Sequence, residues 1–177
     1  MVVDISTFDT TSFGPSDVFF LDTNIILYLH YPPYNSAYKA VIYSNFIAGL
    51  QKSGCSLRVS SFNVQEAFHV IETLELNSYN SKQSTPLSRK SFRNKYRSYI
   101  GTQASALWSQ IKSNYQIENA IINRDMLDEF INNYTHYRYD PIDYLLTANH
   151  PTCNIISSDY DFSSDPAISV YTYQTGR

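Results

Sequence analysis

The chain has 177 residues, and its 13 lysines and arginines against 16 aspartates and glutamates give a formal net charge of −3. This length suits one domain with a sizeable core, and this charge excludes a globally basic nucleic-acid-binding protein, so that only a local patch is left for that role. The two cysteines, Cys55 and Cys153, lack metal-ligand spacing, and no apolar run fits a signal peptide or a membrane span, so we expect a cytoplasmic protein with reduced thiols and no membrane contact.

Short apolar runs alternate along the chain with longer segments of helical spacing. Residues 1–17, rich in Ser, Thr and Asp, come first and predict a flexible N-terminal leader. Apolar and aromatic runs then predict strands that are covered on both faces of a sheet. The predicted strands are residues 18–21, 57–60, 117–122, 153–157 and 168–173. The predicted helices are residues 24–30, 36–53, 63–76, 88–115, 125–134 and 140–149.

Turn and cap signals set several of these boundaries. Gly54 is typical of a helix end, and Asp140 followed by Pro141 is typical of a helix start. Residues 77–87 are polar and predict a loop, and the long helix after them is expected to break near Gly101. Strands that alternate with helices predict a three-layer α/β/α sandwich with a mostly parallel central sheet. We therefore expect a single domain over residues 18–177 with a basic helical insertion at about 77–115.

Four acids lie next to predicted strand ends or helix starts, and each has a structural interpretation. Asp22 is placed to cap the helix that follows it, and Glu66 stands three residues after Asn63, the spacing of a capping box. Asp143 lies in a first helical turn, where the helix dipole favours a negative charge, and Asp159 suits an Asx-turn. In a parallel sheet, however, all four belong to the same edge, where such folds bind ligands.

Four separate blocks of sequence carry these acids in the same order: "FFLDTNIILYL", "SSFNVQEAFHVIE", "DPIDYLLTANH" and "NIISSDYDF". This pattern resembles the PIN-domain family of metal-dependent ribonucleases, which includes the VapC-type toxins. The resemblance implies a PIN-like fold in which the catalytic and metal-binding acids are Asp22, Glu66, Asp143 and Asp159. It also implies nearby supporting residues, namely Asn24, Ser157, Ser158 and Asp161. Residues 77–115 exceed the compact pattern of the toxins.

The chemistry of such a group agrees with the resemblance. Carboxylates held within about 4–6 Å of one another repel, and at least one should have a raised pKa unless a cation is bound. Mg²⁺ or Mn²⁺ suits an all-oxygen site, where the ion would orient a phosphodiester, lower the pKa of the attacking water and stabilise the leaving 3′ oxygen. We therefore expect an endoribonuclease acting on RNA. By resemblance it would be the toxin of a toxin–antitoxin pair with a cognate antitoxin and a homodimeric state, and the alternative is a non-catalytic PIN-fold module for RNA or protein binding.

Seven basic residues and no acid lie between Leu76 and Ile117, with Tyr96, Tyr99 and Trp108 interleaved. One interpretation is a solvated helix face, in which Trp108 belongs to the core. The other is a surface that contacts the phosphates and bases of single-stranded RNA. In that case the nucleic-acid-binding residues are Arg89, Lys90, Arg93, Lys95 and Arg97.

Three other enzyme classes fit the sequence less well. Glu66 and His69 form the Glu-x-x-His spacing of di-iron proteins, but the motif occurs once and among strands rather than twice in a helix bundle. The segment from Asp22 to Asn24 is similar to the nucleophile loop of haloacid-dehalogenase-type phosphatases, but Asn24 replaces the second aspartate of that loop. No phosphate-binding loop of the G-x-x-x-x-G-K-[ST] type is present.

Overall fold

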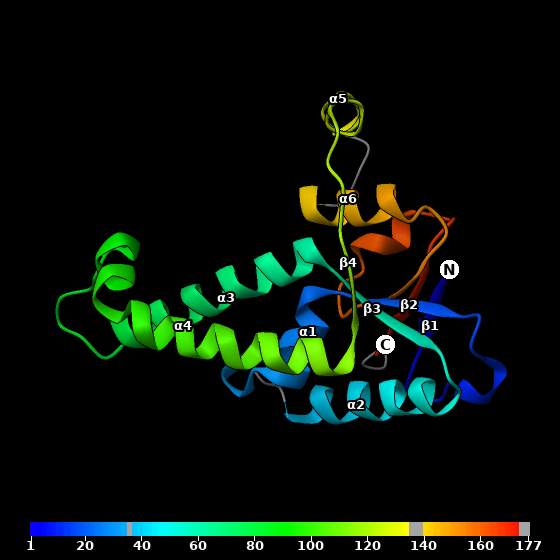
Figure 1. The fold of residues 1–177 in the computed structure, drawn as a ribbon, viewed down its shortest axis with the longest axis horizontal. Helices are drawn as coiled ribbons and strands as arrows, with labels where there is room; N and C mark the ends of the chain where they lie inside the picture. Colours follow the sequence, from blue (N-terminus) through cyan, green and yellow to red (C-terminus); the bar gives the residue numbers. More distant parts are fainter. Residues whose placement is uncertain (35–36, 135–139, 174–177) are drawn as a thin grey trace.

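The structure, a computed structural model, describes residues 1–34, 37–134 and 140–173. In this part of the chain, six strands form one all-parallel sheet in the order β1-β6-β5-β2-β3-β4 (Figure 1). The strands are β1 (Val2–Asp4), β2 (Val18–Leu21), β3 (Ser56–Ser60), β4 (Gln116–Glu118), β5 (Asn154–Ile156) and β6 (Ser169–Thr172). The α-helices are α1 (Thr23–His30), α2 (Ala37–Lys52), α3 (Ser61–Asn80), α4 (Arg89–Asn114), α5 (Arg124–Asn133) and α6 (Pro141–Asn149). The short 3₁₀ helices are η1 (Thr10–Ser12), η2 (Pro32–Tyr34) and η3 (Asp161–Ser164).

Helices cover both faces of the sheet, and the central strand β2 divides its side chains between them. Because side chains alternate along a strand, Phe19 and Leu21 point to one face and Phe20 to the other. Phe19 and Leu21 are buried in a core with residues of α1 to α4, such as Ile25, whereas Phe20 is buried with residues of α6, such as Leu146. The predicted α/β/α sandwich is confirmed, and its sheet is parallel throughout. Among the described residues, no helix is long and apolar enough to cross a membrane.

Strand order reverses around β2, which pairs with β3 on one side and with β5 on the other. Helix α1 follows β2 directly, and α3 follows β3 directly, so both helices begin at the carboxyl edge of the sheet. Helix α6 contacts α3. A crevice beyond the strand ends at such a reversal is the usual ligand site of open α/β sheets, so this edge is where functional residues are expected.

The N-terminal segment corrects one prediction, because residues 1–17 are not a loose leader. Strand β1 pairs in parallel with β6, with Val2 opposite Val170. Phe8 and Phe13 stack on each other, and both contact the ring of Tyr171. The Ser, Thr and Asp content of this segment concealed a three-residue edge strand and two aromatic residues that pack against the core. The strand pairs with β6, and both aromatic rings contact Tyr171, more than 150 residues away in sequence. The domain therefore starts at the N-terminal strand rather than at residue 18.

Helices α3 and α4 pack against each other as a hairpin that extends beyond the sheet (Figure 1), and we call this hairpin the arm. Its base belongs to the core, because Ile71 of α3 and Leu107 and Ile111 of α4 are buried. The basic insertion predicted at about 77–115 is therefore not a separate addition, and the second half of α4 is part of the helical layer. The polar composition of α4 concealed its widely spaced apolar residues. Trp108, expected in the core, is partly buried against it.

The break in α4 lies at Tyr96, which has non-helical φ and ψ of −115° and 19°, and not near Gly101. The ring of Tyr96 packs on those of Phe92 and Tyr79, with centroids 5.0 and 5.1 Å away. Tertiary packing therefore kinks the helix, while an isolated glycine inside a helix costs only about 1 kcal/mol and does not end it.

Helix α3 also runs four residues past its expected end, so that the loop before α4 is shorter than predicted. The Asn80 side chain closes this loop, because its Oδ1 accepts the Leu87 N–H at 2.8 Å and its Nδ2 donates to the Leu87 carbonyl at 3.0 Å. Residue 36, the predicted start of the helix now called α2, lies outside the described residues. Both cysteines, Cys55 and Cys153, are buried and free.

Candidate functional site

Asp22 stands at the junction of β2 and α1 and is 5% exposed. Its Oδ1 accepts the Thr23 N–H at 2.6 Å, so Asp22 does cap α1. Its Oδ2 accepts hydrogen bonds from Ser157 Oγ at 2.6 Å and from Asn24 Nδ2 at 2.5 Å. The Asp22 N–H donates to the carbonyl of Ile156 at the end of β5. Asp22 is therefore both a helix cap and the centre of a polar cluster that joins two strand ends.

The turn after β5 carries the other strand-end acid, Asp159, which is exposed. Its N–H donates to Ser157 Oγ at 2.9 Å, and its Oδ1 accepts the Asp161 N–H at 3.1 Å, which forms the expected Asx-turn. Asn24 Oδ1 accepts the Ser158 N–H at 3.1 Å. Of the four expected supports, Asn24 and Ser157 thus contact this cluster through side chains, while Ser158 and Asp161 do so through backbone N–H groups.

Glu66 approaches the same cluster from α3. Its Oε2 accepts a hydrogen bond from Thr23 Oγ1 at 2.5 Å, so α1 and α3 are linked beside Asp22. The capping-box interpretation of Glu66 is wrong, because α3 starts at Ser61 and its cap is Ser60. The glutamate therefore lies more than one turn inside the helix, where its carboxylate is free to face the strand ends.

Asn63 is a site residue that the sequence did not single out, except as a capping partner. It is 1% exposed, and its Nδ2 donates to Thr23 Oγ1 at 3.1 Å and makes a long contact of 3.5 Å with Asp22 Oδ1. Its Oδ1 is buried without a hydrogen-bond partner among the described residues. Buried amide oxygens nearly always have a hydrogen-bond partner, so this unpartnered acceptor beside Asp22 is an oxygen atom available to a bound group. The sequence could have identified Asn63 as a site residue from its position about one helical turn before Glu66.

Asp143 lies in the first turn of α6. The cap of this helix is Asp140, whose Oδ1 accepts the N–H groups of Ile142 and Asp143 at 2.8 and 2.9 Å. A helix N-terminus favours a negative charge. Burial and neighbouring acids outweigh that effect, because together they raise the pKa of Asp143 to about 9.

Three of the predicted acids have raised pKa values. Burial is the largest cause for Asp22, whose pKa is raised to about 7, with Glu66 and Asp159 adding to the effect. Burial also raises the pKa of Glu66, and the charge of Asp140 adds to it. For Asp143, burial is followed by the charges of Asp22, Asp140, Glu66 and Asp159. These mutual effects place the four predicted acids in one electrostatic group, which we call the acid centre (Asp22, Glu66, Asp143 and Asp159).

The acid centre has some but not all features of a site for a divalent cation. Among the described residues, no three Asp, Glu, His or Cys side chains converge on one point as metal ligands. The donor chemistry nevertheless suits Mg²⁺ or Mn²⁺, because the acids and the orphaned Asn63 Oδ1 supply only oxygen. Mg²⁺ keeps several of its waters in proteins, so that carboxylates reach it partly through water. The donor chemistry of these residues thus suits such an ion, while their side chains do not surround a common point among the described residues.

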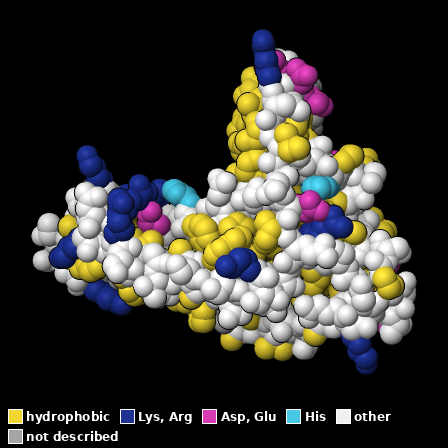
Figure 2. Space-filling model, in the orientation of Figure 1, with side chains coloured by type: hydrophobic (Ala, Val, Ile, Leu, Met, Phe, Trp, Pro, Cys, Tyr) yellow, Lys and Arg dark blue, Asp and Glu magenta, His cyan; other side chains and the backbone are white. Residues whose placement is uncertain are grey.

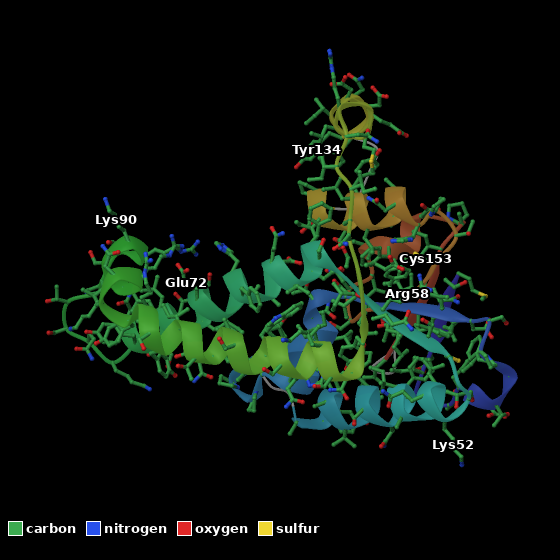
Figure 3. All side chains as sticks on the ribbon, in the orientation of Figure 1. Lys52, Arg58, Glu72, Lys90, Tyr134 and Cys153 are labelled. Atoms are coloured by element: carbon green, nitrogen blue, oxygen red, sulfur yellow. The ribbon has the colours of Figure 1, made fainter. Side chains whose placement is uncertain are left out.

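The five basic residues predicted to bind nucleic acid do not form one surface. Arg89 and Arg93 reach from α4 to α3, where they contact His69, Thr73 and Glu72. Lys90 extends from the tip of the arm (Figure 3). In contrast, the Nζ of Lys95 lies over the rings of Tyr96 and Tyr79, at 5.3 and 6.0 Å from their centroids, and Arg97 is exposed farther along α4. Figure 2 shows Lys and Arg side chains gathered over the far end of the arm.

No known family model matches the chain, and no curated protein matches its sequence. Among solved structures, it is similar to a chain in the crystal structure of VapBC2 from Rickettsia felis bound to a DNA fragment from their promoter. The TM-score is 0.55 at 14% sequence identity, over 89% of this chain and 99% of the other. A likeness at this identity concerns the fold alone, and it agrees with the PIN-like parallel α/β sandwich predicted from the sequence.

Proposed function

We propose that the chain is a metal-dependent endoribonuclease that hydrolyses RNA phosphodiester bonds with Mg²⁺ or Mn²⁺. The observation that carries the proposal is the placement of Asp22, Glu66 and Asp143 at the carboxyl edge of a parallel sheet, where Asp22 is buried and Thr23 links it to Glu66. Burial raises the pKa of all three acids, which agrees with this placement. Carboxylates that are held together against their repulsion are typical of functional sites, and a divalent cation relieves that repulsion. The buried Glu72 of the arm is instead paired with an arginine.

When held by the acid centre, such an ion would supply Lewis-acid chemistry for the phosphodiester and a water of lowered pKa. Residues of α1 and of the turn after β5 fix two of the carboxylates by hydrogen bonds. Ser157, after β5, and Asn24 both donate to Asp22, while Thr23 donates to Glu66 of α3. Side chains that are locked in this way hold their oxygens at defined positions, which positioning of a substrate phosphate requires.

A cleavage assay with the purified chain tests the proposal. We expect end-labelled single-stranded RNA to be cleaved with Mg²⁺ or Mn²⁺ and to stay intact with EDTA. The matched control is Asp125→Asn, an exposed acid in the first turn of α5 that lies outside the acid centre, and it should cleave like the parent. Intact RNA with both metals, from a protein that still melts cooperatively, would favour the non-catalytic RNA-binding or interaction module.

The likeness to a chain of VapBC2 supports a finer proposal, that the chain is the toxin of a toxin–antitoxin pair. Induced expression in a bacterium should then arrest growth, and Asp22→Asn should relieve the arrest at equal protein levels. Equal growth with the parent and with this variant would contradict the toxin proposal and would leave the ribonuclease proposal to the cleavage assay.

A further inference from the structure

One side of α3 runs from the acid centre out along the arm. Glu66, His69 and Thr73 are spaced by three and four residues, so they lie on the same face of the helix. At 1.5 Å per residue, Thr73 is about 10 Å farther along the axis than Glu66. Arg89 crosses to this face from α4. Its Nη1 lies 3.0 Å from His69 Nε2, and its Nη2 donates to Thr73 Oγ1 at 2.9 Å.

A second arginine is held beside the first. Arg93 donates from Nε and Nη2 to the two carboxylate oxygens of Glu72, at 2.9 and 2.8 Å, and Arg89 Nε lies 3.8 Å from the same carboxylate. The Glu72 side chain is only 12% exposed, whereas those of Arg89 and Arg93 are 41% and 48% exposed. The less exposed Glu72 therefore holds two guanidinium groups that remain open to solvent. Glu72 is labelled in Figure 3.

The balance of charge at this place is positive. Two guanidinium groups face one carboxylate, so one positive charge remains uncompensated. Each guanidinium has five N–H groups, and the contacts above use only some of them. If these residues served only to hold α3 against α4, the ion pair of Arg93 and Glu72 would be sufficient. The contacts of Arg89 with a histidine and a threonine add no ion pair, and they orient its planar fork on the face that continues to Glu66.

We propose that Arg89 and Arg93 form a phosphate-binding station for single-stranded RNA whose scissile bond lies in the acid centre. The inference rests on the proposed function and adds where the substrate runs. Arginine forks bind phosphate oxygens in a bidentate manner, and they do so best when their orientation is fixed in advance. The axial separation of about 10 Å is short enough for a single strand of a few nucleotides to contact both places. RNA with a shorter segment on this side of the cleaved bond does not reach the station.

The opposite side of the arm supplies a control. Tyr79 lies about 140° around the α3 axis from Glu66, at 3.6 residues per turn. With Glu75 and Ser78 it lines a cavity of about 360 Å³, which Lys82 also borders. Lys82 is exposed and carries the same charge as an arginine of the station. Lys82→Ala therefore removes one positive charge from the arm without touching the proposed path.

The experiment measures binding separately from cleavage. A fluorescent 12-nucleotide single-stranded RNA is titrated in EDTA at several salt concentrations. Arg89→Ala should weaken binding roughly tenfold at low salt and reduce the slope of log affinity against log salt by about 0.7, the value for one lost contact on a single strand. Arg89→Lys, which keeps the charge but loses the fork, should fall between, and Lys82→Ala should match the parent. Circular dichroism checks that each variant is folded.

The outcomes separate the station from the nuclease. Equal slopes for Arg89→Ala, Lys82→Ala and the parent would overturn the station, even if the chain cleaves RNA with Mn²⁺. A reduced slope in Arg89→Ala alone, without cleavage by the parent, would support the station and refute the ribonuclease. If Arg89→Ala weakens binding of a poly-glutamate peptide and leaves RNA binding unchanged, the face recognises an acidic protein and the RNA proposal is wrong. Cleavage of dinucleotides should not respond to Arg89→Ala.

Discussion

The acid centre and the arm both gather charged side chains, yet they balance the charge in opposite ways. In the acid centre, Asp22 is 5% exposed and receives hydrogen bonds from the neutral donors Ser157, Asn24 and Thr23, while its nearest charges are other acids. In the arm, the similarly buried Glu72 receives two hydrogen bonds from one arginine and lies close to another.

A carboxylate in the first environment has two ways to lower its energy, to bind a proton or to bind a cation. A carboxylate in the second environment already has its counter-ion within the structure. The difference separates acids without a basic partner among the described residues from an acid that is paired within the fold, although both kinds lie near helix α3. Substitution of each kind by its amide is therefore the sharpest way to test the comparison.

The largest effect is expected from Asp143→Asn in the cleavage assay. The amide keeps the shape of the side chain but removes a charge that a divalent cation requires, so RNA cleavage with Mn²⁺ should fall by about a hundredfold or more. Calorimetric titration with Mn²⁺ should show lost or strongly weakened binding in the same variant. Unchanged binding and cleavage would remove Asp143 from the acid centre.

A second prediction concerns stability without metal. The pKa of Asp143 is about 9 and that of Asp22 about 7 in the folded protein, both above the ordinary value of 3.8. The folded state thus keeps protons that the unfolded chain releases, so the free energy of unfolding should decrease as pH rises from about 4 to about 9. Urea unfolding in EDTA at pH 5, 7 and 9 measures this slope. Asp143→Asn should flatten it, and Mn²⁺ should raise the melting temperature of the parent at pH 8.

Glu72→Gln is the matched substitution in the arm, and its effect should have the opposite sign. It leaves two guanidinium groups without their carboxylate, so the free energy of unfolding should fall at pH 8, where Asp143→Asn should raise it. The change in stability between pH 7 and pH 9 should stay as in the parent. A stabilising effect of Glu72→Gln in EDTA would mean that the two environments do not differ as described.

A further prediction tests the polar support of the acid centre. Asn63→Leu keeps the branched shape of the side chain but removes the amide that orients Thr23 and touches Asp22. The expected cost is about 1–2 kcal/mol in urea unfolding, because Thr23 loses a donor in a buried place. Mn²⁺ affinity should fall as well if the orphaned Asn63 Oδ1 is a ligand. Lower stability with unchanged Mn²⁺ affinity would confine Asn63 to a structural role.

The order of elements could be predicted from the sequence because it depends on local signals. The apolar run before Asp22, the helix end at Gly54 and the helix start at Asp140 mark boundaries that the structure keeps to within a few residues. Strand β1 could not be predicted, because a three-residue edge strand exists only through its pairing with β6. The kink at Tyr96 likewise depends on aromatic partners in another helix.

The candidate site was predictable to the extent that motifs mark strand ends. Asp22 and Asp159 follow strands, and the topology then brings those strand ends to one edge. The contacts of Asn63 could not be predicted, because they depend on how α3 is oriented about its own axis. Sequence spacing gives that orientation only approximately. The division of the basic residues between two sides of the arm also depends on this rotation and on the kink. Composition alone could not separate Arg89 from Lys95.

Substitutions at two glycines probe the backbone, one inside the arm at Gly101 and one outside it at Gly54. Gly101 lies inside α4 without a positive φ, and a Cβ at this position would meet nothing within 4 Å. Gly101→Ala should therefore raise the free energy of unfolding by about 0.5–1 kcal/mol, because alanine loses less backbone freedom on folding.

Gly54, at the end of α2, has a φ of 81°, and its Cβ would lie 3.3 Å from Pro15 Cγ. Gly54→Ala should cost about 1–2 kcal/mol, the penalty for a left-handed backbone. Neither change touches the acid centre, so the pH slope and the Mn²⁺ response should match the parent in both variants. A destabilising Gly101→Ala would show that α4 is interrupted there as well as at Tyr96, and a changed Mn²⁺ response would show that the arm and the acid centre are coupled rather than independent.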